Sequence, residues 1–230
     1  MKAQDSSNVL ETRATITVWD LPLRIFHWVL VLLVISQIVT VSIGGNAMEY
    51  HALGGYTILT LVLFRILWGF AGGTHARFAD FLRRPVAVAR YAHRLMKGTA
   101  ATHRGHNPLS GWSVMLMLLS LLVQAMTGLF ANDDVMMKGP LAKHVSGDAS
   151  AVFTAVHDIN AGILLTLISL HILAVLFYLF RRKQDLIGPM FSGRKPIELM
   201  DARPPKTGNL WLAALLLAAS ASLVYFVVTF

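Results

Sequence analysis

The feature that most constrains the fold of this 230-residue chain is a set of five long apolar runs. Each run is long enough to cross the roughly 30 Å hydrocarbon core of a bilayer as a helix. Charged residues make up 14% of the chain, whereas soluble domains average about 25%. The sequence therefore predicts an all-α membrane protein with five transmembrane helices. They cover about residues 19–43, 50–70, 109–130, 152–180 and 210–230.

The distribution of basic residues predicts how these helices are oriented. Seventeen of the twenty Lys and Arg residues lie in three places: before the first helix or in its first turns, in the loop 71–108, and in the segment 181–209. The two loops on the other side hold only Lys138 and Lys143. The positive-inside rule then places the N-terminus in the cytoplasm and the C-terminus outside. The same rule explains the net charge of +8, so no nucleic-acid partner is predicted.

The chain contains no cysteine, which limits the cofactors that it can hold. Disulfides, zinc–thiolate sites, iron–sulfur clusters and covalently attached c-type haem are excluded. Any metal centre must use other side chains, and histidine is the ligand type that the apolar runs offer.

Four histidines within the apolar runs form two pairs at matched depths. His157 and His171 lie fourteen residues apart on one predicted helix, which separates them by about 21 Å along the axis and only about 40° around it. His51 opens the second helix on the outer side, and His27 lies in the first turns of the first helix on the cytoplasmic side. Helical rise therefore pairs His51 with His157 on the outer side and His27 with His171 on the inner side.

A pair of histidines from facing helices can bind a haem iron from both sides. A bare zinc ion would need a third or fourth ligand, and neither carboxylate nor cysteine stands at these depths. Glycines near the histidines leave room for a macrocycle; they are Gly54, Gly55, Gly128 and Gly162. The alternative for any single histidine is a hydrogen-bonded structural residue, but two depth-matched pairs favour ligands.

Two arginines in the helices are further candidates for the cofactor site. Arg65 lies fourteen residues after His51, at the depth of the inner pair. It either extends to the cytoplasmic interface or forms an ion pair with a haem propionate. Arg24, one turn before His27, has the same two options and lies closer to the interface.

The remaining polar side chains receive structural interpretations. Hydrogen bonds between helices are expected for Gln37, Gln124 and Asn160. Five histidines fall in predicted loops and are expected at the surface; they are His75, His93, His103, His106 and His144.

These residues resemble the bacterial cytochrome b-561 family, which is grouped with the b-type cytochrome subunit of nickel–iron hydrogenases. The motifs are Arg24-Ile25-Phe26-His27-Trp28, His51-Ala52-Leu53-Gly54-Gly55 with Arg65, Arg104-Gly105-His106-Asn107-Pro108, His157 with His171, and Ser192-Gly193-Arg194-Lys195. The resemblance covers about residues 19–195.

The resemblance implies a four-helix transmembrane bundle over residues 19–195 that holds two non-covalent haem b groups. His27, His51, His157 and His171 would be the axial ligands, with Arg65, Arg24 and Gly54 near the cofactors. A cytoplasmic tail (1–18) would precede the bundle. A linker with a fifth helix (196–230) would follow it, and this helix departs from the four-helix core. The expected location is the bacterial inner membrane.

The leading functional prediction is electron transfer between a quinone pool and a periplasmic or membrane redox partner. One alternative is a superoxide or quinone oxidoreductase that reacts at a haem edge, because Lys138, Lys143 and His144 on the outer loop could attract an anion. The acidic Asp133, Asp134 and Asp148 in the same loop favour instead a basic partner, such as a small c-type cytochrome or a hydrogenase subunit. A proton or metal carrier without haem is the last alternative.

Overall fold

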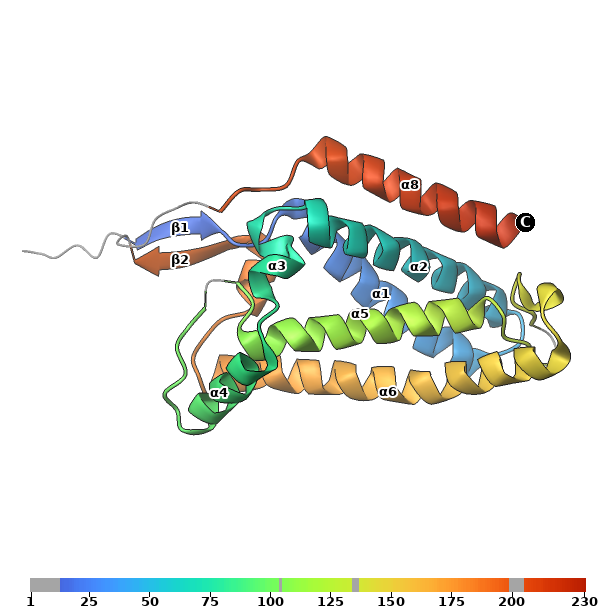
Figure 1. Ribbon diagram of the computed structural model, residues 1–230, viewed down its shortest axis with the longest axis horizontal. Helices are drawn as coiled ribbons and strands as arrows, with labels where there is room; N and C mark the ends of the chain where they lie inside the picture. The colour runs from blue at the N-terminus through green and yellow to red at the C-terminus, as the bar shows by residue number, and fades with distance from the viewer. Residues whose placement is uncertain (1–12, 104, 134–136, 199–204) are drawn as a thin grey trace, which may run out of the picture.

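Five long helices lie side by side in the computed structural model, which describes residues 13–103, 105–133, 137–198 and 205–230 (Figure 1). They are α1 (Leu21–Ile43), α2 (Ala47–Ala71), α5 (Pro108–Gly128), α6 (Gly147–Phe180) and α8 (Leu210–Thr229). All five are long and apolar enough to cross a membrane. The five predicted spans are thus confirmed. Arg104 and Asp134, which the sequence analysis named, lie outside the described residues.

Side-chain caps fix where four of these helices begin. Asn107 accepts hydrogen bonds from the backbone N–H groups of Leu109 and Ser110, and Pro108 occupies the first turn of α5. Asp20, Ser146 and Asn209 cap α1, α6 and α8 in the same way. Such caps satisfy N–H groups that have no partner within the helix. Because Ser146 caps it, α6 starts five residues before its apolar run.

The helices pack in the order α1 on α2, α2 on α5 and α8, and α5 on α6. In the described part of the chain, α1 and α6 are not among the pairs with extensive backbone contact. α8 lies along the outer side of α2 (Figure 1). Its Val224 packs with Leu59 and Leu129 in a buried cluster. α8 contains no histidine.

Short elements gather at one end of the bundle, which we call the basic end. It carries η1 (Thr74–Ala76), α3 (Phe78–Phe81), α4 (Pro85–Met96), α7 (Ile187–Ser192) and the strands β1 (Arg13–Thr17) and β2 (Arg194–Glu198). The strands pair antiparallel with Thr17 opposite Arg194. The predicted tail 1–18 is therefore partly ordered as a strand, and its residues 1–12 lie outside the described part. The other end, which we call the far end, carries η2 (Ala142–His144).

A hydrogen-bonded network holds α4, α5 and α6 together at the basic end. The hydroxyl groups of Tyr91 on α4 and Tyr178 on α6 lie 3.0 Å apart. The amide of Asn107 donates to the Tyr178 hydroxyl at 3.0 Å. Asn107 therefore caps α5 with its oxygen and binds Tyr178 of α6 with its nitrogen, and the Tyr91 hydroxyl connects α4 to the same group.

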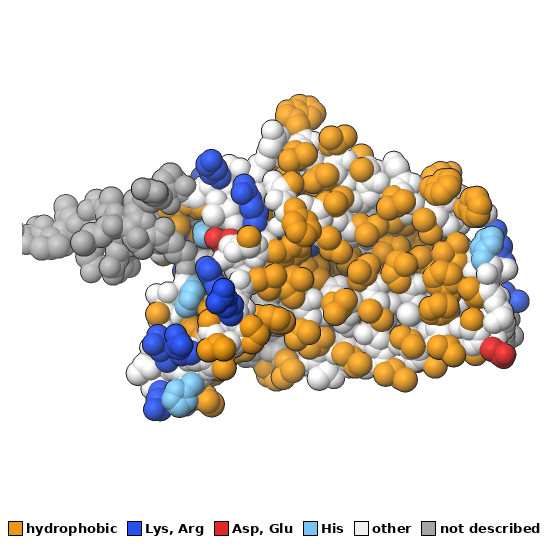
Figure 2. All heavy atoms as spheres, viewed as in Figure 1, with side chains coloured by type: hydrophobic (Ala, Val, Ile, Leu, Met, Phe, Trp, Pro, Cys, Tyr) orange, Lys and Arg blue, Asp and Glu red, His pale blue; other side chains and the backbone are white. Residues whose placement is uncertain are grey.

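The surface of the bundle is apolar along its length. Hydrophobic side chains cover the helices, and Lys and Arg gather at the basic end (Figure 2). Leu32, Ile43 and Phe70 are each more than two-thirds exposed. Apolar surface of this extent is rare on soluble monomers. It is what helices facing lipid require.

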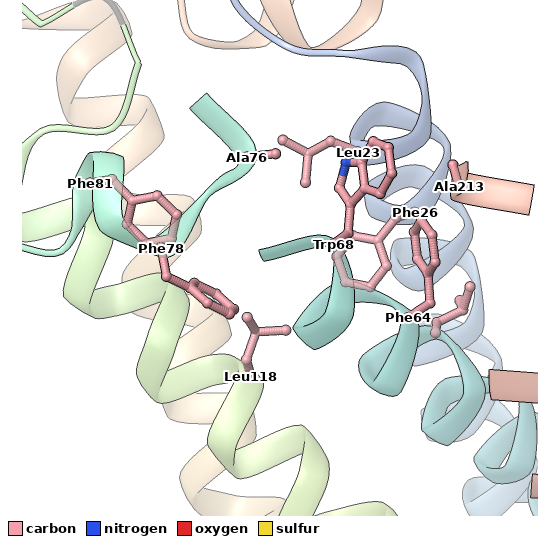
Figure 3. Close-up of a cluster of buried hydrophobic side chains, with 10 residues drawn as sticks. Leu23, Phe26, Phe64, Trp68, Ala76, Phe78, Phe81, Leu118 and Ala213 are labelled. Carbon is pink, nitrogen blue, oxygen red and sulfur yellow. The ribbon is translucent and has the colours of Figure 1, made fainter. Parts of the chain in front are cut away.

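The largest buried cluster lies near the basic end. Phe64 and Trp68 of α2 pack with Leu23 and Phe26 of α1 and with Phe78 of α3 (Figure 3). Phe81, Leu118 and Ala213 extend the cluster to α5 and α8. Trp68 is fully buried. The cluster thus fixes the short α3 against the ends of the membrane helices.

Candidate functional site

His51 and His157 face each other at the far end, from α2 and α6. Their ring centres lie 6.3 Å apart and the ring planes are 73° from parallel. Both residues are half-buried. The structure thus brings together the two histidines that the depth argument paired on the outer side.

Hydrogen bonds at Nδ1 orient both rings. The Nδ1 of His157 lies 2.9 Å from the backbone oxygen of Gln124 and 3.3 Å from the Thr127 hydroxyl. The Nδ1 of His51 lies 3.3 Å from the Thr40 hydroxyl. Each hydroxyl also donates to a carbonyl one turn earlier, so it accepts from the imidazole. Nδ1 therefore carries the proton in both rings, and Nε2 keeps the lone pair that binds a metal.

The separation of the two rings fits a single iron between them. A metal–imidazole nitrogen distance is about 2.0–2.1 Å, and a ring nitrogen lies about 1.1 Å from the ring centre. Two imidazoles on opposite sides of one iron thus have centres roughly 6 Å apart. The observed 6.3 Å agrees with this spacing. No third metal ligand is required, and the described residues contain no cluster of three or more His, Cys, Asp or Glu.

His27 and His171 approach each other nearer the basic end. Their imidazoles, on α1 and α6, are close enough to interact electrostatically. The Nδ1 of His27 is enclosed and has no hydrogen-bond partner among the described residues. Both residues are half-buried. The second predicted pair therefore lies in one region, about 21 Å along α6 from His157.

Arg65 does not extend to the interface, so that alternative is wrong. Its side chain is 1% exposed, and its guanidinium carbon lies 5.2 Å from the centre of the Phe78 ring. Nη1 and Nη2 find no acceptor among the described residues. A buried charge without a partner is destabilising by several kcal/mol. The burial arises because α3, which the sequence analysis did not predict, covers the end of α2.

Arg24 instead fastens α7 to α1. Its Nη1 donates to the backbone oxygen of Phe191. One turn later, the indole N–H of Trp28 donates to the backbone oxygen of Met190 at 3.3 Å. Trp28 also stacks on the Phe191 ring at 4.2 Å. This position agrees with the prediction that Arg24 extends to the interface, rather than with an ion pair to a haem propionate.

The glycines differ in what surrounds them. A Cβ added to Gly54 would lie 2.1 Å from the Gln37 amide nitrogen. The space beside this glycine is therefore filled by a side chain of α1. Gly128 allows close approach of His157, whose Cε1 would lie 3.0 Å from an added Cβ. Gly55 and Gly162 border open space. Only the latter two therefore have the free volume that was predicted for all four.

The polar residues of α5 and α6 form the predicted contacts between helices. Asn160 donates to the Ser120 carbonyl at 2.9 Å and to Gln124 Oε1 at 2.7 Å. The Ser120 hydroxyl donates back to Asn160 at 3.0 Å. Gln37 differs, because its enclosed Nε2 has no hydrogen-bond partner in the part of the chain that the structure describes.

His106 is the residue that sequence reasoning missed. Its ring packs between Trp19 and Phe81, with its centre 4.6 Å from each of theirs. Its Nδ1 is enclosed and has no partner within the described ranges. Burial, and then the nearby Arg65, His75 and His171, lower the pKa of His106 to about 3. The surface interpretation is thus wrong for this histidine. The signal was its place in the motif Gly105-His106-Asn107-Pro108.

The other loop histidines are more accessible. His93 and His144 are exposed. His75 Nδ1 lies 2.8 Å from Asp80 Oδ2, and the His103 ring meets Tyr91 edge-on at 5.2 Å. None of these four has an enclosed nitrogen without a partner among the described residues.

The fold and the paired imidazoles define a class of protein, the membrane-embedded helical cytochromes. The family model of prokaryotic cytochrome b561 matches residues 18–193, and the chain belongs to that family. It is a multi-pass protein of the bacterial inner membrane and a b-type cytochrome of electron transport.

Curated relatives agree with this assignment. A probable Ni/Fe-hydrogenase B-type cytochrome subunit of Rhizobium leguminosarum bv. viciae is 23% identical, over 80% of this chain and 90% of the relative. Proteins of the same description from Azotobacter chroococcum mcd 1 and Azotobacter vinelandii are each 21% identical, over 89% of this chain and 97% of the relative. No solved structure matches the chain.

Proposed function

We propose that this protein is a di-haem b-type cytochrome that passes electrons between a quinone pool and a redox partner at the outer face of the membrane. The observation that carries the proposal is the opposition of His51 and His157 across 6.3 Å, with both Nδ1 atoms already hydrogen-bonded. His51 and His157 bind one iron, and His27 and His171 bind the other. Haem, when bound, supplies a reversible one-electron couple.

The protein's own residues position and insulate the two sites. Thr40, Thr127 and the Gln124 carbonyl bind Nδ1 of the two far-end histidines, which leaves both Nε2 atoms available to a metal. Two histidines on one iron leave it no open position, so reaction at the metal itself is prevented. The four helices α1, α2, α5 and α6 form the haem-binding bundle, and α8 packs outside it. Arg65 supplies a buried positive charge at the second site.

The partner that we favour is a hydrogenase-like subunit. Three relatives of similar length are described as Ni/Fe-hydrogenase cytochrome subunits. The basic end faces the cytoplasm under the positive-inside rule, so a periplasmic partner would bind the far end. The superoxide alternative has less support there, because Lys143 donates to the Phe230 backbone oxygen at 3.2 Å and His144 stacks on the Phe230 ring.

A pyridine haemochrome assay on the purified protein tests the haem content. We expect two non-covalent haem b groups per chain. His157→Ala and His171→Ala should each lose one haem and keep the other, whereas the exposed His144→Ala and His93→Ala, which serve as matched controls, should keep both. One haem in the unmodified protein, or two in either ligand variant, would contradict the proposed pairs.

Reduction of the haems by a quinol or by a hydrogenase tests the proposed redox partners. Added quinol should reduce the haems of the purified protein, and a co-expressed hydrogenase should reduce them in membranes when hydrogen is supplied. Haems that respond to superoxide but to neither of these donors would instead support the oxidoreductase alternative.

A further inference from the structure

Two side chains near the second histidine pair have enclosed nitrogen atoms without a hydrogen-bond partner in the described part of the chain. One is the guanidinium of Arg65 on α2, and the other is the imidazole of His106, just before α5, at its Nδ1. Groups of this kind are rarely left unsatisfied in a folded protein. We propose that Arg65 and His106 together bind one carboxylate group, a propionate of the haem held by His27 and His171. This inference rests on the proposed function.

No acidic side chain among the described residues forms an ion pair with Arg65. Asp20 is the acidic residue that acts on it electrostatically, but the Asp20 oxygens accept hydrogen bonds from Leu23, Gly73 and Trp68. No ion pair joins Asp20 to Arg65 in the described part of the chain. A guanidinium offers two parallel N–H donors that match a carboxylate, and both Nη atoms are available for one.

His106 is fixed so that it can donate to the same group. Trp19 and Phe81 hold its ring from two sides. The ring is neutral at physiological pH, since its pKa lies at about 3, and so it carries a single N–H. When Nδ1 holds that proton, it is a buried donor that needs an acceptor.

A chain of aromatic contacts places the two donors in one region. Arg65 lies over Phe78, Phe78 meets Phe81 edge-on at 5.8 Å, and Phe81 lies against His106. Phe78 and Phe81 project from α3 toward the membrane helices (Figure 3). Arg65 and His171 both act electrostatically on His106, so the region borders the second histidine pair.

The enclosure of this region selects the source of the carboxylate. A lipid headgroup or a soluble anion would reach an exposed arginine, whereas Arg65 is 1% exposed. The acceptor must therefore belong to a group that is bound among the helices. A haem between His27 and His171 carries two propionates, and one of them meets this requirement.

The test compares variants of His106 in protein loaded with haem. His106→Phe keeps a ring between Trp19 and Phe81 but removes the donor, and His106→Asn restores an N–H close to the position of Nδ1. His75→Phe is the matched control, because His75 is a neighbouring imidazole that already has a partner in Asp80. Haem content, the reduction potential of each haem, and infrared difference spectra with carboxyl-labelled propionates are measured.

In His106→Phe we expect both haems to remain, and one propionate band to shift. The equilibrium constant for reduction of one haem should fall by about tenfold, because a carboxylate that loses a donor stabilises the oxidised iron more strongly. His106→Asn should restore most of both signals, and His75→Phe should change neither. Unchanged bands and potentials in His106→Phe would reduce His106 to a packing residue and overturn the inference.

Two other outcomes separate this inference from the proposed function. Loss of one haem in both His106→Phe and His106→Asn would make His106 an axial ligand in place of His27, which overturns the carboxylate role but not the cytochrome. If His106→Phe does not fold, the unmodified protein can be loaded with haem whose propionates are methyl esters. The same potential should then shift, and a potential that does not respond would also overturn the inference. A protein that binds no haem would refute the proposed function itself.

Discussion

Asp20, the cap of α1, accepts hydrogen bonds from the indole N–H of Trp68 near the end of α2, with its two oxygens 3.3 and 3.2 Å from Nε1. The same carboxylate accepts from the backbone N–H groups of Leu23 and Gly73. It is 8% exposed. One side chain thus starts α1 and fixes it against the end of α2 and the loop that follows.

Asp20→Ala should therefore destabilise the protein more than the loss of an ordinary helix cap. The change removes the cap and leaves two buried donors unsatisfied, which together should lower the free energy of unfolding by about 2–4 kcal/mol. Asp20→Asn keeps one acceptor and should lower it less. Thermal unfolding in detergent, followed by near-ultraviolet circular dichroism, measures both. Asp148→Ala, at an exposed acid in the first turn of α6, is the control and should change stability little.

The absence of cysteine makes the orientation directly testable, because any introduced cysteine is a unique label site. Met96 on α4 is 81% exposed at the basic end, and Asp148 is exposed at the far end. A membrane-impermeant maleimide should label Asp148→Cys in intact spheroplasts and Met96→Cys only after lysis, because the positive-inside rule predicts that the basic end faces the cytoplasm. The reverse pattern would require the opposite orientation of every helix.

The depressed pKa of His106 predicts a pH dependence of stability. Its folded-state pKa is about 3, below the usual value near 6.5, so the unfolded chain binds a proton that the folded chain excludes. The contribution of neutral His106 to the free energy of unfolding is fully present above pH 6.5. It is lost as the pH falls from there toward 3, by up to about 1.4 kcal/mol per pH unit. The melting temperature of His106→Phe should depend less on pH across that range. His93→Phe, at an exposed site, should behave as the unmodified protein.

Sequence periodicity predicted the membrane helices and the pairing of their histidines because both depend on local rules. Apolar length determines a span, and helical rise determines depth. His157 and His51 could be matched in this way without knowledge of any contact between helices.

The features that sequence reasoning missed depend on contacts between distant segments. β1 pairs with a strand about 180 residues later. The burial of Arg65 and His106 requires α3 to fold back over the basic end, where Phe78 and Phe81 cover them. No pattern within a loop shows where that loop will pack. Gly54 is a third case, because the space beside it is taken by Gln37 of another helix.

The two threonines that orient the far-end histidines should differ in importance. Thr40 lies 3.3 Å from His51 Nδ1, and the Gln37 backbone is a further acceptor for that ring. Thr127 shares His157 Nδ1 with the Gln124 carbonyl, which is closer, at 2.9 Å. Loss of such a partner lowers metal affinity by about 10- to 100-fold. Thr40→Val should therefore weaken binding of one haem by at least about tenfold, and Thr127→Val should have a smaller effect because the carbonyl still fixes the ring.

Haem titration of the two variants, followed at the Soret band, measures this difference. Thr166→Val is the control, because its hydroxyl donates only within α6, to the Gly162 carbonyl. Equal losses in Thr40→Val and Thr127→Val would mean that the Gln124 carbonyl does not orient His157. No loss in Thr40→Val would mean that the Gln37 backbone, the iron or packing holds His51 without the threonine.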